Sequence, residues 1–167
     1  KVEGMRGKAS YLSGGSVTKP EFRAKLLAGE SEIAAGEISG ISSNSRAVLR
    51  DFPTSAWRAA RLDNARRLRA RLEGVEGVEL LGWSDGATPF SAILVLPNLE
   101  ARDRLRAHLI ASSVYPAILW PVAESELNGI TELDLSLADR LLSVHCDGRY
   151  DKADMERLAD VIIEGVS

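Results

Sequence analysis

The chain has 167 residues, of which 45% are hydrophobic, 27% charged and 5% aromatic, a composition typical of a folded globular domain. Its 24 acidic residues outnumber 21 basic ones, and the net charge of −3 argues against a protein dedicated to nucleic acid or to anionic membrane surfaces. The longest uncharged apolar run, residues 90–97, is far shorter than the roughly 20 residues that span a bilayer. Because the chain starts at Lys1 and shows no signal-peptide pattern, we expect a fragment of a cytoplasmic protein.

The first part of the chain has helical patterns. Apolar residues recur at helical spacing between Met5 and Leu12. Residues 18–21 (Thr-Lys-Pro-Glu) form a capping-box sequence with proline in the first turn, which predicts a helix beginning at Thr18. The strongest helical pattern runs over residues 56–73 and is stopped by two glycines.

The second part alternates short apolar runs with helical patterns. Strands are expected at residues 78–83, 91–96 and 142–146, with helices capped by Asn98 and Asp151. Residues 114–120 contain one proline and precede another, so they predict an edge strand or an extended loop. A polar loop is expected at 123–132, followed by a short helical turn capped by Ser136.

This order predicts an α+β fold, with N-terminal helices followed by a small, mostly antiparallel sheet that helices cover on one face. We expect two parts, a helical segment of residues 1–55 and an α+β domain of residues 56–167.

Two polar residues fall on the apolar side of the helix predicted over residues 56–73. A helical wheel places Arg61 at the centre of the stripe and Asn64 beside it. A buried guanidinium needs a partner, so Arg61 either pairs with an acid elsewhere in the fold or contacts a ligand or a second subunit. The other arginines of this helix are expected on a solvated face; they are Arg58, Arg66, Arg67, Arg69 and Arg71.

Two further segments hold candidate site residues. Tyr115-Pro116 and Trp120-Pro121 bracket a stiff, ring-rich segment that either walls a pocket or packs on the core. Cys146 lies between His145 and Asp147, but neighbouring residues on a strand point to opposite faces and cannot converge on one ion. We therefore expect no metal site and no Cys–His nucleophile, and interpret Cys146 as a small buried residue.

Several of these motifs together resemble a known family in their order and spacing. They are Arg61-x-x-Asn64 with Leu68 and Leu72, Tyr115-Pro116-x-x-x-Trp120-Pro121, residues 142–150 (Leu-Ser-Val-His-Cys-Asp-Gly-Arg-Tyr) and residues 153–158 (Ala-Asp-Met-Glu-Arg-Leu). In this the chain is similar to the C-terminal part of fold-type-I pyridoxal-phosphate (PLP) enzymes, in particular the DegT/DnrJ-type aminotransferases. The resemblance covers nearly the whole chain, with residues 1–55 as crossing helices and residues 56–167 as the small domain.

The resemblance implies roles for the candidate residues. Trp120 and His145 would line the pocket, and Tyr115 belongs to a loop that closes over cofactor and substrate. The substrate-facing or structural groups would be Arg61, Asn64 and Arg149. Gly148 stands where similar sequences often have a larger polar residue, which weakens any inference about substrate there.

The resemblance also implies a parent enzyme that uses PLP, acts on a small-molecule amino donor and acceptor, and forms a homodimer. The family's Schiff-base lysine lies in a large domain that this chain lacks, and Lys8, Lys19 and Lys25 sit in helical patterns. We therefore expect no catalytic residue in this chain, no PLP bound to it alone and no transamination by it. The alternative is a stand-alone α+β regulatory or interaction domain, with the helical first part as a dimerisation arm.

Overall fold

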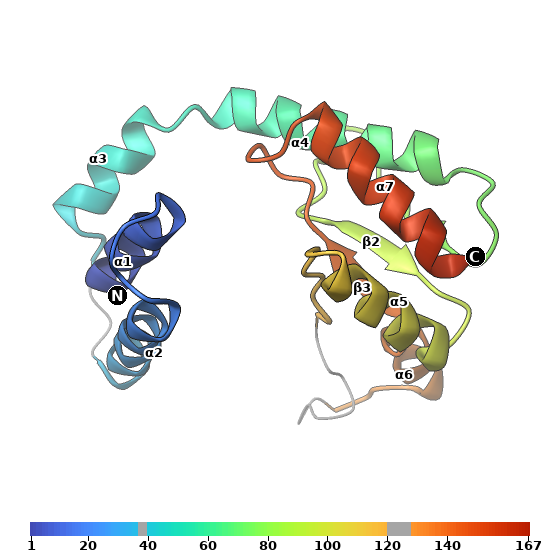
Figure 1. The fold of residues 1–167 in the computed structure, drawn as a ribbon, viewed down its shortest axis with the longest axis horizontal. Helices are drawn as coiled ribbons and strands as arrows, with labels where there is room; N and C mark the ends of the chain where they lie inside the picture. The colour runs from blue at the N-terminus through green and yellow to red at the C-terminus, as the bar shows by residue number, and fades with distance from the viewer. Residues whose placement is uncertain (37–39, 120–127) are drawn as a thin grey trace. The chain divides into compact units, whose positions relative to one another are not determined.

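The computed structural model describes residues 1–36, 40–119 and 128–167. The chain divides into two compact units, Lys1–Phe52 and Pro53–Ser167 (Figure 1).

Over residues 1–36 and 40–52, the first unit contains three helices, α1 (Val2–Leu12), α2 (Lys19–Ala35) and α3 (Ser43–Asp51). Helices α1 and α2 pack against each other, and they approach closely because Gly4 has no side chain: a Cβ there would lie 2.9 Å from the backbone nitrogen of Leu26. Among the described residues of this unit, Phe22 is the one large apolar side chain that is buried, beneath the ring of Tyr11 at 5.4 Å between centroids. The first unit is therefore a helical hairpin with very little core.

The capping box predicted at the start of α2 is confirmed. The Glu21 carboxylate accepts a hydrogen bond from the backbone N–H of Thr18 at 2.7 Å. Together with the bond to the Thr18 hydroxyl, this lowers the pKa of Glu21 below its usual value, because both donors stabilise the carboxylate.

In its described residues, the second unit holds four helices and a sheet. The helices are α4 (Thr54–Leu72), α5 (Leu99–Ala111), α6 (Glu132–Ala138) and α7 (Lys152–Val166). Among the described residues the strands are β1 (Glu79–Leu80), β2 (Ala92–Val95) and β3 (Leu141–Val144), all antiparallel in the order β1-β2-β3. The predicted α+β class is confirmed.

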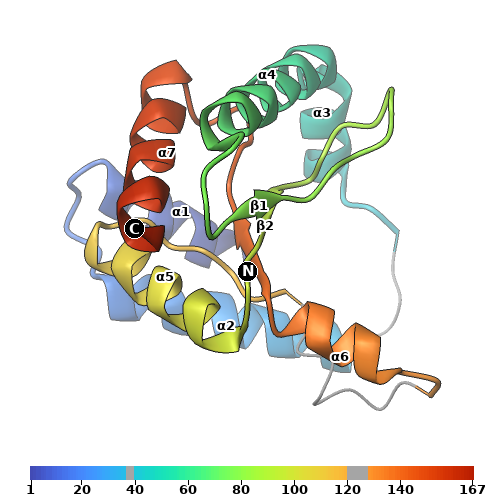
Figure 2. The ribbon, with the colours of Figure 1, turned by 90° about the vertical axis from the view of Figure 1, so that its right-hand side faces the viewer.

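The strand register determines which side chains form the core. Ala92 lies opposite Val144 and Leu94 opposite Leu142, and all four are buried. The alternate positions on the other face, such as Ile93 and Val95, are only half-buried. The buried face of the sheet and side chains of α4, α5 and α7 form one apolar cluster that includes Leu68, Leu105 and Ile162. Figure 2 shows the ribbons of these three helices beside the strands. None of the helices in the described part of the chain is both long and apolar enough to cross a bilayer.

Two local predictions need correction. The first strand is confined to Glu79–Leu80, because it pairs with β2 over only two residues before the chain turns away. The short helix α6 begins before Ser136, because Thr131 and Asp134 form a capping box that our prediction overlooked. Residues 114–119 behave as predicted for an edge segment: Ala117 exchanges two backbone hydrogen bonds of 2.9 Å with Ser143 of β3.

Four of the five arginines predicted on a solvated face of α4 are exposed, namely Arg58, Arg66, Arg69 and Arg71, and three of these four also contact neighbouring elements. The Arg58 guanidinium donates to the Thr88 hydroxyl and to the Gly86 carbonyl, each at 2.9 Å. Arg69 stacks over Trp83, 3.6 Å from the ring centroid to the guanidinium carbon. On the side toward α7, Arg71 forms ion pairs with Glu156, at 3.2 Å, and with Asp160. These side chains attach α4 to the β1–β2 connection and to α7.

Candidate functional site

A pocket lies where the end of α5, the end of β3 and the first turns of α7 meet. Its volume is about 260 Å³, and every lining residue that the structure describes belongs to the second unit. Val114, Val144, Met155 and Leu158 supply apolar lining. The remaining lining residues carry polar atoms; they are Ser113, Tyr115, His145, Tyr150, Asp154 and Arg157.

Two rings of this pocket are arranged by the turn between β3 and α7. His145 follows the last residue of β3, and Tyr150 precedes the N-cap of α7, Asp151. The turn brings the two rings into a stacked arrangement, with centroids 6.2 Å apart and planes 18° apart. The pocket therefore has a flat, aromatic wall.

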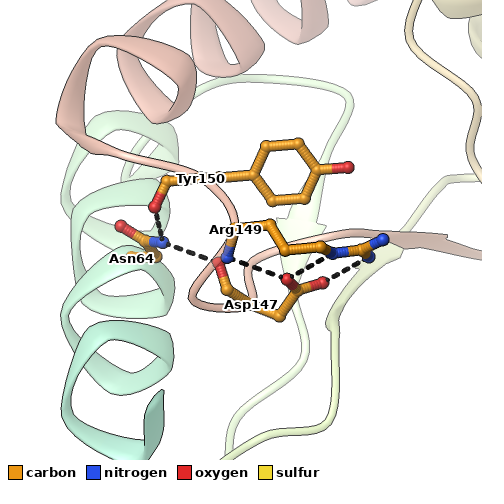
Figure 3. A network of polar contacts seen from close by, with 4 residues as sticks. All are labelled: Asn64, Asp147, Arg149 and Tyr150. Atoms are coloured by element: carbon orange, nitrogen blue, oxygen red, sulfur yellow. Dashed lines mark hydrogen bonds and ion pairs between the residues drawn. The ribbon is translucent and has the colours of Figure 1, made fainter. Parts of the chain in front are cut away.

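A network of polar contacts fixes that turn against α4 (Figure 3). The buried Asn64 side chain donates from Nδ2 to the backbone carbonyls of Asp147, at 3.2 Å, and Tyr150, at 2.9 Å. Because both acceptors are backbone atoms of the turn, Asn64 holds the backbone from which the Tyr150 ring projects. The Asn64 side chain thus contacts backbone of the turn and does not line the pocket.

The same turn is held internally by an aspartate and an arginine. The buried Asp147 carboxylate accepts from the Arg149 backbone N–H at 3.1 Å, from its Nε at 2.8 Å and from its Nη2 at 2.7 Å. Hydrogen bonding from the Arg149 side chain lowers the pKa of Asp147 to about 2, although burial opposes the shift. Arg149 is occupied by this contact and also lies over the Tyr150 ring, at 5.5 Å from its centroid.

Gly148 is explained by packing. A Cβ at this position would lie 3.2 Å from the indole ring of Trp57, closer than most side-chain contacts. The absence of a side chain therefore lets the turn approach α4, which is a structural reason for glycine at this position.

Arg61 lies outside this network. Its Nε is buried and has no hydrogen-bond partner among the described residues. The acidic partner that we predicted within the fold is therefore not found there. Its guanidinium carbon lies 5.6 Å from the centroid of the Phe90 ring. Cys146 is buried as predicted, and burial raises the pKa of its thiol to about 11 despite the opposing influence of Arg61. Such a thiol stays protonated at neutral pH and is a poor nucleophile.

The structure thus separates the six candidates. Tyr115 and His145 line the pocket, while Asn64 and Arg149 lie in the network behind it. Arg61 contacts Phe90 instead, and Trp120 lies outside the described residues. In the described ranges no three His, Cys, Asp or Glu side chains are placed to hold a metal ion.

Our sequence reasoning missed four polar residues of the pocket, namely Ser113, Tyr150, Asp154 and Arg157. The last two flank Met155 on α7, whose apolar face was predicted correctly. Their i, i+3 spacing placed them on one side of the helix, but nothing in the sequence indicated that the end of α5 would come close to that side.

Comparison with known proteins identifies the fold. No protein-family model matches the sequence, and no curated protein is significantly similar to it. Among solved structures, the chain is similar to the aminotransferase TlmJ from Streptoalloteichus hindustanus, with a TM-score of 0.59 and 18% identity over 70% of this chain and 33% of that one. It is also similar to a DegT DnrJ EryC1 StrS aminotransferase from Brucella abortus, with a TM-score of 0.57 and 23% identity over 74% and 34%.

A third similar structure is DesV from S. venezuelae in complex with a ketimine intermediate, with a TM-score of 0.56 and 22% identity over 68% of this chain and 33% of that one. One neighbour is described as a DegT DnrJ EryC1 StrS aminotransferase, and others are described as sugar aminotransferases, such as CalS13 from Micromonospora echinospora. The predicted resemblance is confirmed for the fold. The chain spans about a third of the length of the structures that it matches.

The pocket does not fit the cofactor that this family resemblance implies. PLP is held through a lysine imine, and none of the five lysines of the chain lines the pocket. Four of them, Lys1, Lys8, Lys19 and Lys25, belong to the first unit, and Lys152 lies on α7 outside the pocket lining. No step of a PLP reaction can therefore be derived from the side chains of this pocket.

Proposed function

We propose that this chain is the C-terminal part of a PLP-dependent aminotransferase, with residues 1–55 as the crossing helices and residues 56–167 as the small domain. The observation that carries the proposal is the shared fold, which covers 68–74% of this chain and about a third of each aminotransferase compared. One similar structure, a putative sugar aminotransferase from Streptococcus pneumoniae, is described in its PMP form, which supports the same cofactor here.

In this proposal the parent enzyme is a cytoplasmic homodimer that transfers an amino group between small molecules. PLP supplies the electron sink for that chemistry and is bound by a lysine outside residues 1–167. The small domain contributes one side of the substrate pocket, where Tyr115, Trp120 and His145 position the substrate. Asn64 and Arg149 hold the turn behind these residues. Arg61 either contacts the substrate or has a structural role. The chain alone is inactive because it lacks the lysine and the phosphate site.

Borohydride trapping tests this proposal directly. The 167-residue chain is mixed with PLP, reduced and digested, and the product of the complete reading frame is treated in the same way. We expect a stoichiometric pyridoxyl-lysine only in the complete product, at a lysine outside residues 1–167, together with transaminase activity. A stoichiometric adduct at one of the five lysines of this chain, or none in either protein, would contradict it.

A second function, a stand-alone regulatory or interaction domain with a helical dimerisation arm, is favoured by a different observation. The first unit leaves many large apolar side chains exposed, among them Leu12 (71%), Leu27 (62%) and Ile33 (64%). Monomeric proteins rarely expose apolar surface in such amounts, so a partner surface is expected to cover it. Sedimentation of the 167-residue chain distinguishes the two: a tight dimer that dissociates in Leu12→Glu favours the arm, and a monomer favours the aminotransferase fragment.

A further inference from the structure

The pocket of the second unit has two opposite charges on its rim that do not pair with each other. Asp154 and Arg157 lie three residues apart on α7, where side chains are neighbours, and both line the pocket. No ion pair joins them, and among the described residues neither has an ion-pair partner of opposite charge within 4.0 Å. Arg157 donates from Nη2 to the Ser112 carbonyl at 2.6 Å, and Asp154 accepts from the Asp151 N–H at 3.0 Å.

These hydrogen bonds hold the two side chains in place without neutralising them. The Ser112 carbonyl is uncharged, and the guanidinium has further donors. A hydrogen bond from a backbone amide likewise leaves the Asp154 carboxylate with acceptor sites. The rim therefore offers one positive and one negative group, held at a fixed place, to the same small cavity.

The interior of the pocket is apolar and aromatic. Val114, Met155 and Leu158 line it, and the stacked rings of His145 and Tyr150 add flat surface. Its volume of about 260 Å³ lies just below the range of about 300–1,000 Å³ that is usual for sites of drug-sized ligands. Such a pocket matches a small ligand that has an apolar body and a head group with both a positive and a negative charge.

We propose that this pocket binds a zwitterionic α-amino acid with an apolar or aromatic side chain. Arg157 binds the α-carboxylate, Asp154 binds the α-ammonium, and the side chain lies between the apolar residues and the rings. A purely anionic ligand would meet the Asp154 carboxylate and a purely cationic one would meet Arg157, so only a molecule with both charges satisfies both groups. An acidic side chain such as that of glutamate would have to lose its hydration against the apolar lining, which disfavours it.

The test is calorimetric titration of the 167-residue chain with four probes. L-Phenylalanine is compared with 3-phenylpropanoate, which lacks the ammonium group, with phenethylamine, which lacks the carboxylate, and with L-glutamate. We expect saturable binding of L-phenylalanine and binding at least about tenfold weaker for each of the others, a difference of about 1.4 kcal/mol. Equal binding of 3-phenylpropanoate or phenethylamine, preference for glutamate, or no binding of L-phenylalanine would overturn the proposal.

Two variants locate the site. Arg157→Gln and Asp154→Asn remove one charge each. The Asn side chain of the second variant can still accept the hydrogen bond from the backbone N–H of Asp151, the N-cap of α7. Both variants are expected to bind L-phenylalanine at least about tenfold more weakly than the parent chain, with unchanged circular dichroism. Arg106→Gln, an exposed arginine of α5 that does not line the pocket, is the matched control and should bind normally. Unchanged affinity in both pocket variants would overturn the assignment. Since no transamination is measured, this result is separate from the outcome of the borohydride experiment.

Discussion

The two units of the chain differ in how their helices are stabilised. In the second unit, Pro53–Ser167, helices and strands share one apolar cluster that includes fully buried Leu68, Leu94 and Leu105. In the first unit, Lys1–Phe52, helices α1 and α2 touch through glycines and the ring of Phe22, and most large apolar side chains are exposed. Both units have helical periodicity and good caps, so local sequence signals alone do not produce a core. Most helical stability comes from tertiary packing, and only the second unit has it in full.

The largest effect should appear when the units are separated. A chain of residues 53–167 retains its whole core and should unfold cooperatively in urea, whereas residues 1–52 bury too little apolar surface to offset the loss of chain entropy. Circular dichroism and urea titration of both pieces measure this. A cooperative transition in residues 1–52 alone would remove the contrast between the units.

The next largest effect comes from one leucine of each unit. Leu105→Ala removes a fully buried side chain of α5 and should lower the free energy of unfolding by about 2–5 kcal/mol. Leu27→Ala, at an exposed position of α2, should change it by less than about 0.5 kcal/mol. Urea denaturation of the 167-residue chain gives both values, and similar losses would mean that α2 packs against a surface in solution.

The polar network of the second unit should give a smaller loss. Asn64→Ala leaves the carbonyls of Asp147 and Tyr150 without their donor and should cost about 1–3 kcal/mol. The neighbouring exposed residue offers a control, because Asp63→Ala removes only an ion pair with Arg67 on the helix surface and should cost less than about 1 kcal/mol. If the two variants lose the same free energy of unfolding, Asn64 does not hold the turn.

A pH dependence should follow from the lowered pKa of Asp147. Its folded value of about 2 lies below the unfolded value of 3.8, so the unfolded chain binds more protons in this range. The resulting stabilisation, on the order of 1–2 kcal/mol, is present above pH about 4 and is lost as the pH falls toward 2. Asp147→Asn should therefore be less stable than the parent at pH 7, and the difference should shrink toward pH 2. A difference that does not change with pH would refute this.

The smallest effect separates arginines that look alike in the sequence. Arg71→Ala loses ion pairs with Glu156 and Asp160 on α7 and should cost at most about 1 kcal/mol, since all three side chains are partly exposed. Arg66→Ala, fully on the exposed side of α4, should cost less than about 0.5 kcal/mol. High salt should reduce the first loss and leave the second unchanged. Measurement in low and high salt tests whether the ion pairs stabilise the second unit.

Local chemistry within a few residues was predictable from the sequence by itself. The capping box at Thr18, the caps at Asn98 and Asp151, the α+β order and the burial of Cys146 all follow from patterns that a short segment contains. The resemblance to the aminotransferase family was also visible in the order of the motifs alone, and the shared fold confirmed that resemblance.

Only the tertiary structure decided which of those residues act together. The pocket joins residues that follow α5 (113–115), residues at the two ends of the next turn (144, 145 and 150) and residues of α7 (154, 155, 157 and 158). The turn beside it is held by Asn64 from a helix more than eighty positions earlier. Helical and strand periods tell which face of an element is buried but not which element covers it. For that reason Arg58, Arg69 and Arg71 looked equivalent on the wheel, yet the fold directs them to a loop carbonyl, an indole ring and two carboxylates of α7. The charges of Asp154 and Arg157 line one pocket only because the end of α5 closes one side of it beside them.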